Sequence, residues 1–401
     1  MAESDLMNTS AVADALGIQV STVYAYVSRG ILHPVRTSRA RGSRFRPEEV
    51  FTLKERGRGA ALDGAISEIS SVIAGSLHYR GESALSLAST KTFEQVALFV
   101  ITGIQSDPSG VWRTASYITD TVDRLMEAVP DGIAPADRIK IAIAAAGVVD
   151  PLCMDLRRRA VVATMQTLVA TMVRAISTPS RSESIAQTSI AAQLTCALSD
   201  SADVEFLTPV VETALILLID HALAPSTVAA RIAAASHANP YSVVLTGLNV
   251  GSGSLHGDSP FAIERYLRAL DSARTPVAVL NELSGSVTPG FGHPLYTKRD
   301  PRADAILDRL RSGGGVRMEK VDELLSQVER RDYPAPNAHL ALAALAFVGE
   351  LRPGAAEALF ITARSVGWIA HALEEYSLPS GSVRRRISYL SATNPSQRSG
   401  R

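Results

Sequence analysis

From about residue 66 onward, the chain consists of successive segments rich in Ala, Leu and Val, with Pro or Gly between them. Their apolar positions repeat at helical spacing. Val- and Ile-rich runs flanked by hairpin turns, which would indicate strands, are scarce. No segment repeats at a fixed period, which argues against a solenoid. The pattern therefore predicts a mainly all-α domain over residues 66–401.

The length of 401 residues favours two or three folding units. The sequence GRGAALDG at residues 57–64 contains three glycines and little periodicity, which is typical of a junction. We therefore expect a first domain over residues 1–58, a junction over 59–65 and a second domain over 66–401.

Composition excludes several classes of protein. The 40 Lys and Arg residues balance the 40 Asp and Glu residues, so the net charge indicates no particular partner. Cys153 and Cys196 cannot form a disulfide framework, and neither lies in a pattern with metal-ligand spacing, so we expect no metal. The N-terminus lacks a signal-peptide pattern, and no apolar run reaches the roughly 18–20 residues that span a bilayer. We expect a cytoplasmic protein with no membrane partner.

The first domain begins with the pattern of two short helices, TSAVADALGIQVSTVYAYVS. Thr9 or Ser10 can cap the first helix, and Gly17 provides the turn after it. The second helix begins near Ser21 and Thr22. A helix, a short turn and a second helix are the parts of a helix-turn-helix.

Six arginines and no acidic residue follow between residues 29 and 46. Guanidinium groups placed in this way suit contacts with phosphates. The segments STVYAYVSRGIL and RGSRFRPEEV resemble the winged helix-turn-helix of MerR-like and excisionase-like proteins. The resemblance implies DNA binding through residues 9–46, with contacts from Ser21, Thr22, Tyr24, Arg29 and Arg44. A helical protein–protein module with a solvated basic loop is the alternative.

In the second domain, polar residues gather at the predicted helix junctions. They lie in DHALAPST (220–227), GSLHG (253–257), PGFGHPLY (289–296), DPRA (300–303), ARSVGWIAH (363–371) and RRRISY (384–389). His256 and His293 each have a Gly neighbour, which lets the backbone approach a ligand closely. Together with three separated arginines, they indicate a site for a small dianion with acid–base groups beside it.

These motifs, in this order and with LHYRGESALSLASTKTFEQVALFVITG before them, resemble the citrate synthase family over about residues 66–390. The resemblance implies a mostly helical homodimer with a large subdomain (about 66–257 and 351–401) and a small one (about 258–350). The subdomains would close over oxaloacetate and acetyl-CoA. The implied reaction condenses acetyl-CoA, or a related acyl-CoA, with oxaloacetate to give citrate and CoA. No bound cofactor is implied, and acetyl-CoA serves as co-substrate.

The resemblance also assigns roles to residues. His256 matches the histidine that hydrogen-bonds the enolate oxygen of acetyl-CoA, and His293 the one that polarises the oxaloacetate carbonyl and protonates the alkoxide. His221 matches another oxaloacetate-binding histidine. The carboxylate-binding arginines correspond to Arg302, Arg364 and Arg384, the last of which would reach across the dimer. The backbone that helps to hold CoA corresponds to Pro289, Gly290, Phe291 and Gly292.

The sequence departs from the family at the catalytic base. The family places an Asp in a segment like PNVDF, whereas residues 336–340 here read PNAHL and put His339 at that position. A neutral imidazole, with an unperturbed pKa of about 6.5, can accept a proton. Its ring is bulkier than a carboxylate, however, and a misplacement of about 1 Å can cost on the order of 10²-fold in rate. The swap also removes a negative charge beside His256 and His293, which shifts their protonation.

A second departure follows His256, where a small Gly-Gly-Ala run of the family is replaced by Gly257-Asp258-Ser259-Pro260. We therefore expect binding to be retained better than turnover. The first hypothesis is an acyltransferase of citrate synthase type that uses His256, His293 and His339. The second is a transcriptional regulator that senses a dicarboxylate or CoA ester through a non-catalytic citrate synthase fold. A third is a subunit that modulates an active paralogue in a mixed dimer.

Overall fold

The computed structural model describes residues 6–16, 20–28, 32–35, 43–46, 50, 67–105, 111–130, 132–177, 188–199, 203–253, 260–272, 289–331 and 333–378. The chain divides into two compact units, Met1–Ile66 (unit 1) and Ser67–Arg401 (unit 2).

The described residues of unit 1 form two short helices and a two-stranded ribbon. They are β1 (Met7–Asn8), α1 (Thr9–Leu16), α2 (Val20–Ser28) and β2 (Arg44–Phe45). β1 pairs antiparallel with β2, and α1 contacts α2. The cap of α1 differs from the prediction of Thr9 or Ser10, because the Asn8 side chain accepts the Ala11 amide at 2.8 Å. A small separate core holds the unit together and consists of Val12, Ala13, Val23, Leu32, Phe45 and Val50.

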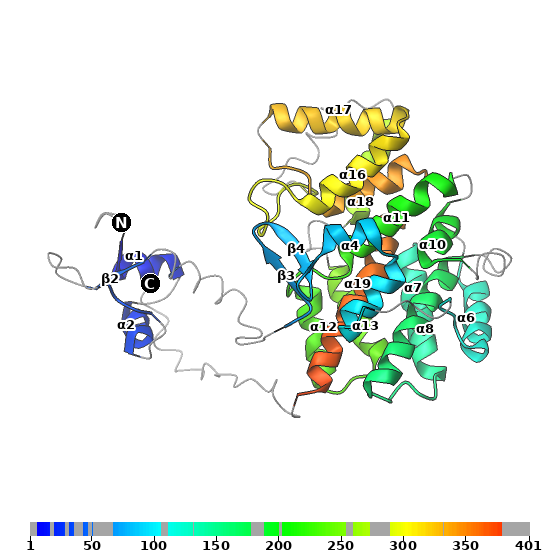
Figure 1. The fold of residues 1–401 in the computed structure, drawn as a ribbon, viewed down its shortest axis with the longest axis horizontal. Coiled ribbons are helices and arrows are strands. Elements are labelled where there is room, and N and C mark those ends of the chain that lie inside the picture. Colours follow the sequence, from blue (N-terminus) through cyan, green and yellow to red (C-terminus); the bar gives the residue numbers. More distant parts are fainter. Residues whose placement is uncertain are drawn as a thin grey trace, which may run out of the picture. The chain divides into compact units, whose positions relative to one another are not determined.

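Unit 2 is mostly helical, as the periodicity predicts (Figure 1). Its first helices are α4 (Ala84–Thr90), α5 (Phe93–Thr102), α6 (Ser116–Ala128), α7 (Pro135–Val149), α8 (Arg158–Ile176), α10 (Ile190–Leu198), α11 (Val204–Leu218), α12 (Pro225–Ala235) and α13 (Pro240–Gly251). Then follow α14 (Pro260–Arg268), the 3₁₀ turn η2 (Ala269–Ser272), α16 (Pro301–Gly313), α17 (Val316–Arg330), α18 (Ala338–Val348) and α19 (Ala355–Tyr376). None of the described helices is long and apolar enough to cross a membrane.

The prediction of a mainly helical domain is confirmed, but the start of unit 2 departs from the all-α class. β3 (Ser70–Ile73), β4 (Ser76–Tyr79) and β5 (Glu82–Ser83) form a three-stranded antiparallel sheet in the order β3-β4-β5. Burial alternates along β4, where Leu77 and Tyr79 are buried. The strands are too short for this alternation to stand out in the sequence. The fold is therefore mostly helical, with small sheets.

Helix α19 runs through the middle of unit 2. All residues from Ile361 to Ala370 are buried, and the helix contacts α5, α7, α8, α11, α12, α13, α14 and α18. Gly367 permits the close approach of the chain that follows α11. A Cβ at this position would lie 2.2 Å from the Ile219 carbonyl oxygen and 3.0 Å from the Asp220 side chain. The glycine thus fixes how closely residues 219–221 pack against α19.

The substitution Gly367→Ala tests this packing. We expect the free energy of unfolding to fall by roughly 1–3 kcal/mol or more, the usual cost of overpacking a core. Chemical denaturation measures the change. Gly251→Ala is the matched control, because its added methyl group would meet the Ser226 side chain at an ordinary 3.9 Å. Equal stability of the two variants would contradict the close approach.

Candidate active site

The glycine-rich loop before His293 needs its glycines. Gly290 and Gly292 have φ angles of 86° and 74°, a left-handed region that other residues rarely adopt. The loop lies against the segment before α18, because the Gly292 amide donates to the Ala335 carbonyl at 2.8 Å and the Asn337 amide donates to the Gly290 carbonyl at 2.9 Å. The residues predicted to hold CoA thus first serve to place His293. Their contact with CoA stays a prediction.

His293 lies at the centre of an aromatic cluster. Its Nδ1 accepts the Leu295 amide at 3.1 Å, so the proton of the neutral ring resides on Nε2. The His221 ring packs edge-on against it with centroids 4.7 Å apart, and the Tyr296 ring lies at 5.0 Å. Tyr296 Oη is also 2.9 Å from His221 Nε2. Two imidazoles and a phenol therefore form one contiguous group.

Arg302 is fixed beside this group by Asp300. The Asp300 carboxylate accepts hydrogen bonds from Arg302 Nε at 3.0 Å and from Arg302 Nη2 at 2.8 Å. It also accepts the Arg302 amide, which caps α16, and the Ala338 amide at the start of α18. Burial opposes ionisation of Asp300, but Arg302 outweighs it and holds the pKa of the carboxyl below its usual range. The Arg302 guanidinium lies 5.2 Å from the centre of the Tyr296 ring.

Arg364 reaches the same region from α19 and is 3% exposed. Its Nε donates to the Leu218 carbonyl at 2.9 Å, and its guanidinium lies 5.0 Å from the centre of the Phe360 ring. Burial lowers the pKa of Arg364, although the charge of Asp220 opposes this effect. Among the described residues, the hydrogen bonds of Arg364 use Nε alone.

His339 is the second residue of α18 and is partly buried. Asn337 caps this helix by accepting the His339 amide at 3.0 Å and the Leu340 amide at 3.3 Å. The imidazole packs edge-on against Phe360 at 5.3 Å between centroids. Phe360 also contacts the Arg364 guanidinium, so His339 and Arg364 share this neighbour.

Burial and positive charge keep the two central histidines neutral. Burial lowers the pKa of His293 to about 4, and the charge of Arg302 adds to this effect. The pKa of His221 is lowered much further, again by burial first and then by Arg302 and Arg364. Burial raises the pKa of Tyr296 to about 12. Near neutral pH the site therefore combines neutral hydrogen-bonding rings with two guanidinium cations.

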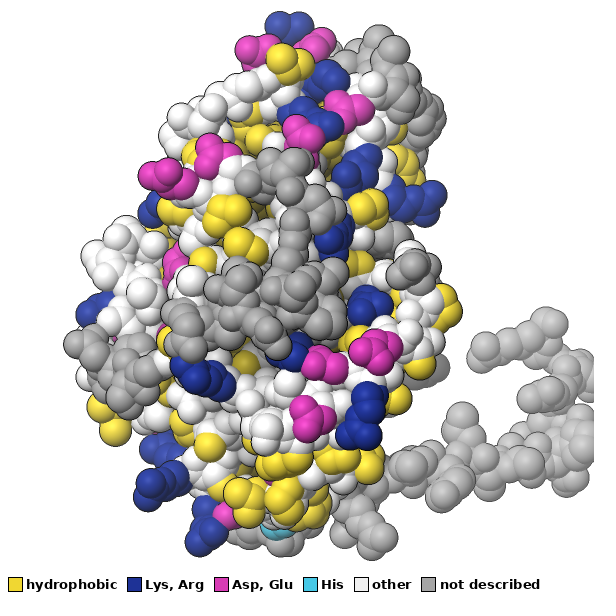
Figure 2. Space-filling view, turned by 90° about the vertical axis from the view of Figure 1, so that its right-hand side faces the viewer, with side chains coloured by type: hydrophobic (Ala, Val, Ile, Leu, Met, Phe, Trp, Pro, Cys, Tyr) yellow, Lys and Arg dark blue, Asp and Glu magenta, His cyan; other side chains and the backbone are white. Residues whose placement is uncertain are grey.

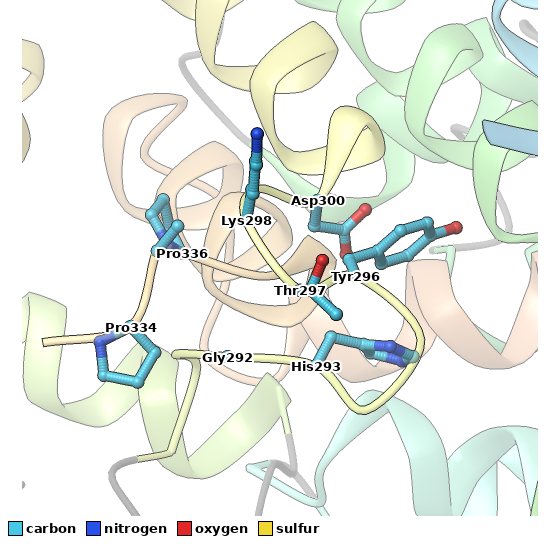
Figure 3. A pocket seen from close by; sticks show the side chains of 9 residues that line it. Gly292, His293, Tyr296, Thr297, Lys298, Asp300, Pro334 and Pro336 are labelled. Carbon is cyan, nitrogen blue, oxygen red and sulfur yellow. The ribbon is translucent and has the colours of Figure 1, made fainter. Parts of the chain in front are cut away.

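A pocket of about 210 Å³ opens beside this cluster. It is lined by Gly292, His293, Tyr296, Thr297, Lys298, Asp300, Pro334, Ala335 and Pro336. Figure 3 shows that the loop carries the His293 and Tyr296 side chains to the same side, whereas Lys298 points away from these rings. Among the described residues, no group of three or more His, Cys, Asp or Glu side chains is placed to hold a metal ion.

The structure brings together five of the predicted site residues, which come from distant parts of the sequence: His221, His293, Arg302, His339 and Arg364. His256 and Arg384 lie outside the described residues. The sequence reasoning missed Tyr296, Asp300 and Phe360. Tyr296 lies inside the motif PGFGHPLY and Asp300 inside DPRA, so their position in these motifs could have identified them as site residues.

The predicted DNA-binding residues lie on two elements of unit 1. Ser21, Thr22 and Tyr24 belong to α2, where the Tyr24 side chain is 57% exposed. Arg44 lies on β2, and Arg29 is outside the described residues. Their contact with DNA stays a prediction.

The helical fold gathers three imidazoles and two buried guanidiniums, a set of groups whose chemistry suits an anionic small molecule. The family described as citrate synthase, C-terminal domain, matches residues 60–386. The chain therefore belongs to the citrate synthase family.

Individual relatives are distant. The citrate synthase of Acidithiobacillus ferridurans is 26% identical over 346 residues, which cover 79% of this chain and 89% of that protein. The citrate synthase of Mycolicibacterium smegmatis is 26% identical over 328 residues, which cover 75% of this chain and 85% of that protein. Among solved structures, the Thermoplasma acidophilum citrate synthase in a ternary complex with carboxymethyl coenzyme A and oxaloacetate has a TM-score of 0.66 at 20% identity. That match covers 84% of this chain and 97% of the other and shows the fold.

The titration of His293 tests the electrostatics of the site. We expect its ring to titrate near pH 4, well below its ordinary value of 6.5, because burial and Arg302 disfavour the imidazolium. The folded state then binds fewer protons than the unfolded state between these values, so His293 lowers the free energy of unfolding as the pH falls through this window. Histidine NMR spectra, assigned with His293→Asn, measure the pKa. The urea-unfolded protein is the control, and a folded-state value near 6.5 would refute the assignment.

Proposed function

We propose that unit 2 binds oxaloacetate and an acyl-CoA and condenses them to citrate, or a homologue of citrate, and CoA. One observation carries the proposal: the buried Arg364 guanidinium uses Nε alone for hydrogen bonds to described residues. Asp220 supplies a negative charge near Arg364, but a buried cation is costly unless its donors are also hydrogen-bonded. Asp300 engages Nε and Nη2 of Arg302, so in this proposal Nη1 is the donor that meets the ligand. A dicarboxylate between the two arginines would satisfy both.

In this proposal His293 acts on the ketone of oxaloacetate. Its neutral ring carries a proton on Nε2, since Nδ1 accepts the Leu295 amide. Nε2–H donates to the ketone oxygen and passes its proton to the alkoxide that forms when the new carbon–carbon bond is made. His221, held by Tyr296, binds the same substrate. His256 would stabilise the enolate oxygen of the acyl group.

His339 serves as the base in this scheme. Its imidazole takes a proton from the carbon next to the thioester carbonyl, and the resulting enolate attacks the ketone carbon. Water then hydrolyses the thioester, and CoA leaves as the thiol. Because the ring is bulkier than a carboxylate, the step is slow compared with one that uses a well-placed aspartate.

Thiol release from acetyl-CoA and propionyl-CoA, with oxaloacetate, tests this function. We expect slow release by the wild type, a loss of about 10²-fold or more in His293→Gln from the missing acid, and a gain on the order of 10²-fold in His339→Asp. His78→Asp, at a partly buried histidine on β4, is the matched control and should release thiol like the wild type.

Silence of both the wild type and His339→Asp would count against the enzyme. A silent wild type with an active His339→Asp variant would instead favour a binding protein that retains the site without turnover.

We also propose that unit 1 binds DNA as a winged helix-turn-helix, which would make the protein a metabolite-sensing regulator. The supporting observation is that α1, α2 and the ribbon surround a core of their own and leave Tyr24 of α2 exposed. Arg44 on the ribbon would contact a phosphate from the position of a wing. The replacement of the family's catalytic Asp by His339 also supports the hypothesis of a metabolite-sensing regulator.

A homodimer would present two such modules to a two-fold-related DNA site. Unit 2 exposes several large apolar side chains that a second copy could cover. Val148 of α7 is 86% exposed, and Leu152 and Met154 just after this helix are 62% and 63% exposed. Figure 2 shows hydrophobic side chains gathered on the lower part of one face of the protein. Patches of this kind mark association surfaces.

A gel shift with DNA from the protein's own promoter region tests the second proposal. At low salt, where phosphate contacts are strongest, we expect a shift that the double variant Tyr24→Ala, Arg44→Ala weakens. His339→Asp is the control, because it changes unit 2 alone. Light scattering of the free protein should give about twice 42.6 kDa. Absence of a shift at low salt, or a mass of one chain, would contradict the proposal.

A further inference from the structure

His221 lies between Asp220 and Ala222, and both of these residues are hydrogen-bonded to Ser70. The preceding residue, Asp220, is fully buried, and its Oδ2 accepts hydrogen bonds from Ser70 Oγ and from His371 Nε2, the latter at 3.1 Å. Ser70 Oγ in turn accepts the Ala222 amide at 3.2 Å. The Ser70 hydroxyl thus bridges the side chain before His221 and the backbone after it.

The backbone after His221 is strained. Ala222 has a φ angle of 52°, in the left-handed region that a residue with a Cβ rarely adopts. Such a conformation costs on the order of 1–3 kcal/mol and persists where surrounding contacts impose it. The hydrogen bond from the Ala222 amide to Ser70 is one contact that supports this conformation. The strain indicates that the direction of His221 is imposed by its neighbours.

His371 supports Asp220 from α19. Its Nδ1 is 2.8 Å from Arg231 Nη1, and because a guanidinium can only donate, this contact favours an accepting Nδ1. Burial opposes the charged imidazole, but Asp220 outweighs it and raises the pKa of His371 to about 9, which favours the imidazolium. Nε2 carries a proton in both forms. His371 therefore donates to Asp220 whichever form is present.

The network continues back to the start of unit 2. Arg231 pairs with Glu374 and with Glu375, each at 2.5 Å. Glu374 then accepts the Glu68 amide at 2.9 Å and Ser67 Oγ at 3.2 Å. The segment that leads into β3 is thereby tied to α12, to α19 and, through Ser70, to the residues on both sides of His221.

We propose that Ser70 and His371, acting through Asp220, are positioning residues that hold His221 against Tyr296 and His293 for the anionic ligand. The inference rests on the proposed function of the site in naming that ligand as a dicarboxylate. It does not require turnover. A network that served only the stability of the fold would leave the His221 ring unchanged when Ser70 loses its hydroxyl.

The test compares Ser70→Ala with Ser71→Ala, an exposed serine of the same strand, and with Ser70→Thr, which keeps the hydroxyl. Two readouts are used: the ¹⁵N resonances of His221 in the ligand-free protein and the Kd for oxaloacetate. We expect Ser70→Ala to shift the His221 resonances and to weaken oxaloacetate binding roughly 10-fold, the effect of one lost hydrogen bond. Ser71→Ala and Ser70→Thr should match the wild type.

Unchanged His221 resonances in folded Ser70→Ala overturn the inference, as does an unchanged Kd in a protein that binds oxaloacetate. If the wild type does not bind oxaloacetate, the proposed function fails, and the His221 resonances alone decide the positioning role. If Ser70→Ala does not fold, Asp220→Asn takes its place in the same comparison, because it keeps the shape of the side chain and weakens both hydrogen bonds.

Discussion

The arrangement of unit 2 depends on one buried helix that carries polar side chains through the core. Arg364 and His371 are seven residues apart on α19, so they lie on the same face two turns from each other. Both are almost completely buried, and a buried charged or polar group must find partners. The partners are the Leu218 carbonyl at the end of α11 and, immediately after that helix, Asp220. The burial of α19 therefore fixes the chain on which His221 lies.

The site forms where this core meets two loops that other forces shape. Left-handed glycines and backbone hydrogen bonds hold the loop of His293 against the segment before α18. Asp300 joins the starts of α16 and α18 by accepting amides from both while it pairs with Arg302. His339 is placed by the same helix start. Different residues thus have different roles: carboxylates and backbone groups fix the geometry, and imidazoles and guanidiniums would face the proposed ligand.

The sequence predicts the helical class of the fold and the residues that make up the site. It does not predict the hydrogen bonds between those residues as well. Proline and polar caps mark the helix starts at Asp300 and Asn337, and ordered motifs indicate which histidines and arginines come together. The strands of the sheet that begins at Ser70 were not predicted because they are too short to give a clear alternation. The bond between His221 and Tyr296 and the Asp220–His371 pair were not predicted either, since each joins segments far apart in the chain and depends on three-dimensional packing.

The proposed function requires that two buried guanidiniums and their neighbouring imidazoles bind a dicarboxylate. Isothermal titration of the wild type and of Arg364→Met with oxaloacetate tests it most directly, because methionine can fill part of the space of the arginine without its charge. We expect saturable binding of one oxaloacetate per chain. In the variant this binding should be roughly 30-fold weaker or more, since removing one partner of a buried charge pair costs at least about 2 kcal/mol. Absence of binding by the folded wild type, or equal affinity of the two proteins, would contradict it.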